Sequence, residues 1–192
     1  ALPIFKGPGH DPMVVEHERP AEEYASVDVL DASFTDWAAV VAGMVVVSPN
    51  FGVNNAAAKL LTWPFARIWI PLLVGRERHV EALNPEHGKY WTNVYPIVAT
   101  LPMAALVRKV IGKNFGDVSV PALFIMSEKD QVVRPDMIEK IAKLWGGEKQ
   151  VLKVIPGAND DAEAHVLAGD IFSPDLTQQV VEKILDWFKS IK

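Results

Sequence analysis

The stretch that decides the fold is Val120-Pro-Ala-Leu-Phe-Ile-Met-Ser-Glu-Lys-Asp130. Its apolar run is short and closed by a polar turn, which predicts a buried parallel strand over residues 120–127. Asp130 falls in the turn that follows this strand. Because functional side chains of open parallel sheets gather at the carboxyl ends of the strands, Asp130 is a candidate site residue.

The pattern after Asp130 predicts the order strand, helix, strand, helix. A helix is expected to open at Pro135-Asp136 and to end at Gly146-Gly147, because proline favours the first turn of a helix and glycine its end. A second strand is expected over residues 150–155, and a last helix from about Asp175 to Ile191. This alternation predicts an α/β fold with a mainly parallel sheet flanked by helices.

His165 lies in the loop that joins the second of these strands to the last helix. A carboxylate at Asp130 can accept the Nδ1–H of this imidazole, which fixes the tautomer and leaves Nε2 free to take a proton from a hydroxyl. Taken alone, Asp130 could equally be a turn or helix-capping residue, and His165 a solvated histidine among the carboxylates of its loop. Their joint placement favours an acid–base pair.

The first part of the chain is less regular. Residues 1–43 are expected to form an irregular N-terminal part, with short strands at Val14-Val15 and residues 27–30 and a helix starting near Thr35, because prolines and glycines interrupt longer elements. Met44 to Ser48 is a β-branched run stopped by Pro49, which predicts a buried strand.

Residues 53–115 are predicted to be helical, and prolines cut them into short pieces. Asn54 or Asn55 can cap the first helix, and Leu101 to Ile111 are expected to form another. The aromatic residues between Trp63 and Tyr95 are expected to be core; the functional alternative is an apolar acyl or alcohol pocket under a lid. His79 and His87 are expected to be solvated.

Several motifs together resemble the C-terminal half of the α/β-hydrolases. They are residues 121–133, the turn Pro156-Gly157, the segment His165-Val-Leu-Ala-Gly-Asp170, the closing helix around Val181 to Phe188, and Val45-Val-Val-Ser-Pro49, which resembles the strand after the family's nucleophile helix. The similarity is closest to esterases, carboxylesterases and monoacylglycerol-lipase-like serine hydrolases and covers about residues 44–192. The resemblance implies an inserted helical cap at 53–115 and the C-terminal half of the core at 116–192. It matches Asp130 to the triad acid and His165 to the triad base.

The chain departs from that family at the nucleophile. No Gly-x-Ser-x-Gly occurs in the 192 residues, and residues 35–43 leave too little room for the nucleophile turn and its helix before the strand at 44–48. Ser48 precedes Pro49, which offers no amide for an oxyanion hole, and Ser127 lies too close in sequence to Asp130. We therefore expect the nucleophile in segments outside these 192 residues, with a junction near Ala42 to Val45.

Composition argues against other classes of protein. The net charge is -5 and Lys and Arg form no stripe, so nucleic-acid binding is not expected. The absence of cysteine removes disulfides, thiolate chemistry and cysteine-type zinc sites. The acidic and histidine residues between His10 and Glu18 match no metal-ligand spacing, and the glycines form no phosphate loop, so neither a metal nor a cofactor is expected.

The apolar stretch from Leu60 to Gly75 contains Arg67 and two prolines and is short for a membrane span. No signal peptide is visible, and we expect a cytoplasmic protein.

The sequence therefore favours a single α/β-hydrolase-like domain over residues 1–192 that acts on a small-molecule carboxylic ester with an apolar acyl or alcohol part. The alternative is a non-catalytic hydrolase-like protein that binds an apolar ligand or a partner through its aromatic region. A parallel sheet without its central strand would expose apolar edges. We therefore expect these residues alone to be poorly stable unless missing segments, or a second copy of the chain in a homo-oligomer, fill the gap.

Overall fold

The structure, a computed structural model, describes residues 41–191. The strands expected at Val14-Val15 and 27–30, the start of the helix near Thr35 and the residues between His10 and Glu18 lie outside this range. The elements in chain order are β1 (Met44–Val47), η2 (Ala56–Thr62), α2 (Ala66–Val74), β2 (Glu77–His79), α3 (Pro85–Tyr90), β3 (Val94–Pro96), η3 (Ile97–Ala99), α4 (Thr100–Ile111), η4 (Phe115–Asp117), β4 (Ala122–Met126), α5 (Pro135–Leu144), β5 (Lys149–Lys153) and α6 (Pro174–Ser190).

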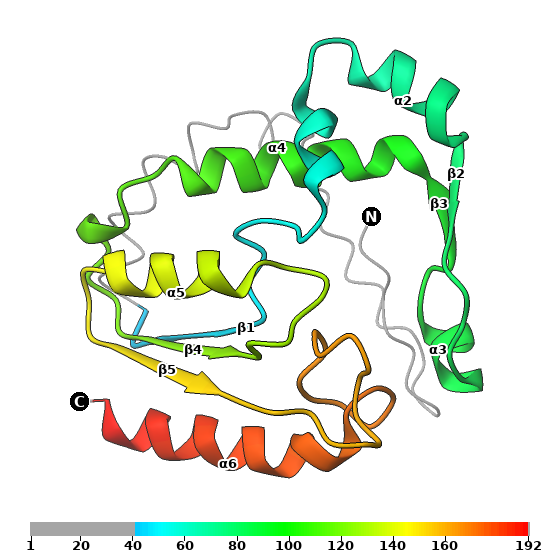
Figure 1. The fold of residues 1–192 in the computed structure, drawn as a ribbon. Helices are drawn as coiled ribbons and strands as arrows, with labels where there is room; N and C mark the ends of the chain where they lie inside the picture. The colour runs from blue at the N-terminus through cyan, green and yellow to red at the C-terminus, as the bar shows by residue number, and fades with distance from the viewer. Residues whose placement is uncertain (1–40, 192) are drawn as a thin grey trace, which may run out of the picture. The chain divides into compact units, whose positions relative to one another are not determined.

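Three parallel strands form the main sheet, in the order β1–β4–β5 (Figure 1). Met44 pairs with Ala122 at the start of β1, and Ala122 also pairs with Lys149 at the start of β5. All five residues of β4 are buried, as expected of a central strand whose two faces are both covered. The predicted parallel sheet flanked by helices is therefore confirmed for the described residues.

Successive residues of β4 point into two different apolar cores, as the pleat of a strand requires. Phe124 packs with residues of α5 in the first core, and Leu123 and Ile125 pack with residues of α6 in the second. Figure 1 shows α5 and α6 on opposite sides of the sheet. The buried members of the first core are Phe115, Ala122, Phe124, Met126, Val133, Ile138, Ile141, Ala142 and Trp145. Those of the second are Leu123, Ile125, Val154, Leu167, Leu176, Val180 and Trp187.

The strand predicted at Met44 to Ser48 is present as β1, but the prediction that it is buried is wrong. β1 pairs with β4 on one side and forms an edge of the sheet within the described part of the chain. Met44, Val45 and Val46 are half-buried, and Val47 is 41% exposed. An apolar run of this kind marks a strand, but the number of neighbouring strands decides how much of it is covered.

Helix α5 follows the predicted start signal and ends slightly earlier than expected. Pro135 occupies its first turn, and Ile138, Ile141 and Ala142 share the face that is buried against the sheet. The helix stops at Leu144, because Trp145 adopts an extended backbone and its Nε1–H donates to the Val120 carbonyl at 2.8 Å. The indole therefore ties the end of α5 to the segment that enters β4.

Gly146 lies where two backbone segments approach closely, which leads to a stability prediction. A Cβ at this position would overlap the Gly116 carbonyl oxygen and lie 3.0 Å from that of Val118. We expect Gly146→Ala to lower the free energy of unfolding by about 3 kcal/mol, because backbone atoms cannot rotate away from an added methyl group. Urea unfolding measures this change. The matched control is Gly112→Ala, whose Cβ would meet nothing closer than 3.6 Å. Equal urea midpoints for the two variants would contradict the prediction.

Residues 53–115 are largely helical, as predicted, but they also contain a small sheet. Asn55 caps η2, since its Oδ1 accepts the Ala57 N–H at 2.9 Å. The helical prediction does not hold at β2 and β3, which pair antiparallel from Glu77–Pro96 to His79–Val94. Strands of three residues are too short to show an alternating pattern, so sequence periodicity does not reveal them. Within residues 41–191, every helix is too short or too polar to cross a bilayer.

Candidate acid–base pair

Asp130 follows the carboxyl end of β4 in a turn that its own side chain stabilises. Its Oδ1 accepts the backbone N–H groups of Val132 and Val133, both at 2.8 Å. The side chain is 1% exposed. A buried carboxylate that accepts amide protons at one oxygen has its second oxygen available for another donor.

The Asp130 turn is held from the segment that follows β1. Val53 and Val133 form an antiparallel bridge. The Asn54 N–H donates to the Val132 carbonyl, and the Arg134 N–H donates to the Gly52 carbonyl, both at 2.8 Å. These bonds on both sides of Val133 fix the backbone that carries the two amide donors of Asp130.

His165 meets Asp130 across the edge of the sheet. Its Nδ1 lies 3.0 Å from the second carboxylate oxygen, Oδ2, of Asp130. An ionised carboxylate only accepts hydrogen bonds, so a neutral imidazole paired with it in this way carries its proton on Nδ1 and has a lone pair on Nε2. The His165 side chain is 29% exposed, and no side chain of residues 41–191 bonds its Nε2. The structure thus brings the two predicted residues together; their catalytic role stays a prediction.

The loops that carry the pair are also joined to each other. Gln131, next to Asp130, donates its backbone N–H to the Glu163 carbonyl at 2.9 Å and its side-chain Nε2–H to the Ala162 carbonyl at 3.1 Å. The relative position of the carboxylate and the imidazole therefore does not depend on their own hydrogen bond alone.

Sequence reasoning missed the role of the two aspartates in the His165 loop. The carboxylates near His165 suggest a solvated loop, yet Asp160 and Asp161 are buried. Asp160 caps helix α6, because its Oδ1 accepts the N–H groups of Asp175 at 3.0 Å and Leu176 at 3.2 Å. Asp161 accepts the N–H groups of His165 at 3.0 Å and Val166 at 2.8 Å. In a sequence, the capping residue of a helix is sought directly before its first turn. Asp160 is distant from α6 in the sequence, so that search does not find it.

Neither serine at the carboxyl ends of these strands is presented to the imidazole. The Ser48 hydroxyl donates to the backbone carbonyl of His165 at 2.6 Å. The Ser127 hydroxyl accepts the N–H of Lys129 at 3.2 Å. Among the described residues, no hydroxyl is hydrogen-bonded to the His165 ring. The two serines therefore take structural positions beside the pair, in keeping with their rejection as nucleophiles.

The expectation that His87 is solvated is wrong. His87 is 4% exposed and its Nδ1 accepts the Leu83 N–H at 3.1 Å. Its ring packs edge-on against Trp91 and Phe172, with ring centroids at 5.6 and 4.8 Å. Asn84 adds a hydrogen bond to the Ile171 carbonyl at 3.0 Å. Helix α3 therefore packs on the loop that carries His165, a long-range contact with no local sequence signal. His79 is exposed, as expected.

The aromatic and apolar residues around α2 are not core. Phe65 is 76% exposed and Leu72 is 78% exposed, and Trp63, Ile68, Leu73 and Val74 are also exposed. Only Ala66 and Ile70 of this helix are buried. Tyr90 and Trp91 are exposed as well, and Trp69 and Tyr95 are only half-buried. The prediction that the aromatic set is core is therefore wrong; around α2 the reason is that a short helix can bury only one of its faces.

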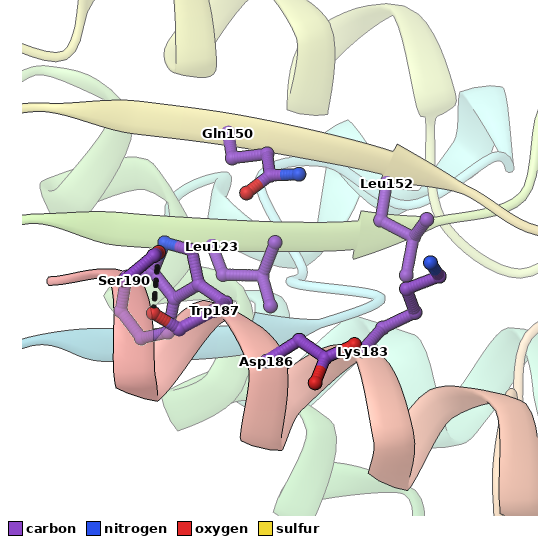
Figure 2. A pocket seen from close by; sticks show the side chains of 7 residues that line it. All are labelled: Leu123, Gln150, Leu152, Lys183, Asp186, Trp187 and Ser190. Atoms are coloured by element: carbon purple, nitrogen blue, oxygen red, sulfur yellow. Dashed lines mark hydrogen bonds between the residues drawn. The ribbon is translucent and has the colours of Figure 1, made fainter.

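A shallow recess of about 240 Å³ lies between α6 and strands β4 and β5 (Figure 2). It is lined by Leu123, Gln150, Leu152, Lys183, Asp186, Trp187 and Ser190. Leu123 is near the amino end of β4, whereas Asp130 follows its carboxyl end. The recess is therefore not part of the acid–base site.

The parallel sheet with α5 and α6 on its two sides has the arrangement of an α/β-hydrolase-like fold. A solved structure from work on LipS and LipT, two metagenome-derived lipolytic enzymes, is similar to this chain with a TM-score of 0.55 and 17% identity, and the alignment covers 82% of this chain and 58% of that one. A soluble variant of monoglyceride lipase from Saccharomyces cerevisiae, solved with a substrate analogue, is similar with a TM-score of 0.47 and 12% identity over 83% of this chain and 58% of that one. This chain thus spans less than two thirds of either structure. No protein-family model and no curated protein matches the sequence.

Proposed function

We propose that the protein is a serine hydrolase that cleaves carboxylic esters with an apolar acyl or alcohol part. The observation that carries the proposal is the 3.0 Å contact between His165 Nδ1 and Asp130 Oδ2, in which the carboxylate is buried and the imidazole is partly exposed. The nucleophilic serine is proposed to lie outside these 192 residues, because they contain no Gly-x-Ser-x-Gly.

In this mechanism His165 acts first as a general base and then as a general acid. Nε2 takes the proton of the serine hydroxyl as its oxygen attacks the ester carbonyl, and it later gives that proton to the leaving alcohol. Asp130 holds the required tautomer and stabilises the imidazolium that forms. Two backbone amides outside the described residues are proposed to bind the oxyanion. The exposed apolar side chains between Trp63 and Val74 support an apolar substrate.

The second candidate is a non-catalytic hydrolase-like protein that binds an apolar ligand or partner. The specific observation in its favour is the group of exposed apolar side chains on α2 and directly before it, with Phe65, Ile68 and Leu72. An exposed apolar patch of this kind is typical of a binding surface.

A fluorophosphonate probe separates the two candidates, because it labels a serine only where an acid–base pair activates it. We expect stoichiometric labelling of one serine in the wild-type full-length protein, together with hydrolysis of p-nitrophenyl octanoate. Labelling should be lost when His165 is replaced by alanine and kept when the exposed His79 is replaced. Absence of labelling in folded, full-length protein would reject the hydrolase and favour the binding protein.

A further inference from the structure

The backbone of His165 is held at both of its polar groups by side chains that the sequence did not single out for this role. We infer that Asp161 and Ser48 are positioning residues, which aim the His165 imidazole by fixing its N–H and its C=O. This inference rests on the proposed acid–base function of the Asp130–His165 pair and names further residues that this function requires.

Asp161 binds the backbone on both sides of His165. Its Oδ2 accepts the His165 N–H at 3.0 Å and the Val166 N–H at 2.8 Å, and its Oδ1 accepts the Glu163 N–H at 3.1 Å. The residue is 7% exposed. Hydrogen bonds to an ionised acceptor are stronger than those between neutral groups, so one carboxylate here orders a whole turn.

The turn that Asp161 orders contains an unfavourable backbone conformation. Ala164, directly before His165, has φ of 53°, a left-handed conformation that residues other than glycine adopt infrequently. Its N–H donates to the Asp161 carbonyl at 2.9 Å. Such a conformation persists only where the surroundings hold it, and it sets the direction in which the next side chain leaves the backbone.

Ser48 holds the other polar group of His165. Its hydroxyl donates to the His165 carbonyl at 2.6 Å, and its own N–H donates to the Ile125 carbonyl of β4 at 2.9 Å. Ser48 also has a left-handed backbone, with φ of 43°. The carbonyl of His165 is thereby connected to β4, whose five residues are all buried.

Three different segments thus bind three different groups of one residue. Asp161 binds the N–H of His165, Ser48 binds its C=O, and Asp130 binds its Nδ1. The fourth polar group, Nε2, is the one that the proposed chemistry needs. A general base must lie within hydrogen-bond distance of the proton that it removes, and a misplacement of about 1 Å can cost about 100-fold in rate.

Each positioning residue has a matched control of the same residue type. Asp160 is a buried carboxylate adjacent to Asp161, but it caps α6 and does not contact His165. Ser127 is a buried serine at the end of β4, as Ser48 is at the end of β1, and it bonds the N–H of Lys129 instead. Substitution of any of these four residues should therefore lower the stability of the fold. Only substitution of Asp161 or Ser48 should also change the position of the His165 imidazole.

The experiment compares Asp161→Asn with Asp160→Asn, and Ser48→Ala with Ser127→Ala, in the full-length protein. We expect Asp161→Asn and Ser48→Ala to lower kcat for p-nitrophenyl octanoate by about 10- to 100-fold with little change in KM, since the geometry of the base changes and the substrate contacts do not. The controls should keep the wild-type kcat, although Asp160→Asn should lower the melting temperature. The second readout is the nitrogen-15 shift of the His165 ring, which reports the nitrogen that carries the proton. It should show a single Nδ1–H tautomer in the wild type and controls and mixed tautomers in the two test variants.

Two results would overturn the inference. One is a melting temperature lowered equally in Asp161→Asn and Asp160→Asn, with kcat and the ring tautomer of both unchanged. The other is a Ser48→Ala variant that is indistinguishable from Ser127→Ala in both readouts. Failure of the proposed function looks different: the wild type would then hydrolyse no ester, while the ring shifts would still separate the test variants from the controls.

Discussion

Asp130→Asn is expected to lower kcat for ester hydrolysis by about 10⁴-fold, because it reverses the tautomer of His165. The N–H groups of Val132 and Val133 hold an oxygen at the Oδ1 position, both at 2.8 Å. The asparagine amide nitrogen must therefore occupy the Oδ2 position and donate to Nδ1. The imidazole proton then moves to Nε2, which can no longer accept a proton from the nucleophile.

The control for this substitution removes the same charge a few residues away. Asp136 is exposed, and its hydrogen bond from Arg134 lowers the pKa of the Asp136 carboxyl below its usual value, so it is ionised at neutral pH. Asp136→Asn should keep wild-type activity. Hydrolysis rates are to be compared after circular dichroism has shown that both variants are folded. Wild-type activity in Asp130→Asn would remove Asp130 from the mechanism.

Phe124→Ala is expected to have the largest effect on stability, a loss of about 3–5 kcal/mol in the free energy of unfolding. Phe124 lies in the central strand, has no exposed surface and packs edge-on against Trp145, with ring centroids 5.4 Å apart. Its removal leaves a cavity between the sheet and α5, and neighbours in two regular elements can close such a cavity only in part.

Urea unfolding of the full-length protein measures this loss as a lower midpoint. The matched control is Phe188→Ala on α6, a helical phenylalanine that is 59% exposed and that should change stability by less than about 0.5 kcal/mol. If the two variants had the same midpoint, β4 would not be the centre of the core, and the assignment of the two apolar clusters to its two faces would be wrong.

The sheet and its helices could be predicted because their signals are local. The apolar run before Asp130, the proline at the start of α5 and the amphipathic pattern of α6 each lie within one element. The meeting of Asp130 and His165 was also predictable, since β4 and β5 are adjacent and parallel and the loops after them leave the same edge of the sheet. That argument predicts that the two loops lie near each other, but it gives no distance between the two side chains.

The extent of burial could not be predicted from the same patterns. Val47 and Phe65 belong to apolar runs and are exposed, whereas Asp161 and His87 are polar and buried. Three of these outcomes depend on segments far away in the sequence: Ser173 for Asp161, Phe172 for His87, and the number of neighbouring strands for Val47. Local hydrophobicity does not contain this information.

The sequence by itself determined the order of strands and helices from β4 onward and the two residues of the candidate pair, because short-range periodicity and turn chemistry specify both. Only the tertiary structure decided that the pair is in contact at 3.0 Å and that Asp161 and Ser48 hold the backbone of His165. The physical reason is that a hydrogen bond between distant segments depends on how the sheet and loops pack in three dimensions. The residue types alone do not reveal which partners will meet.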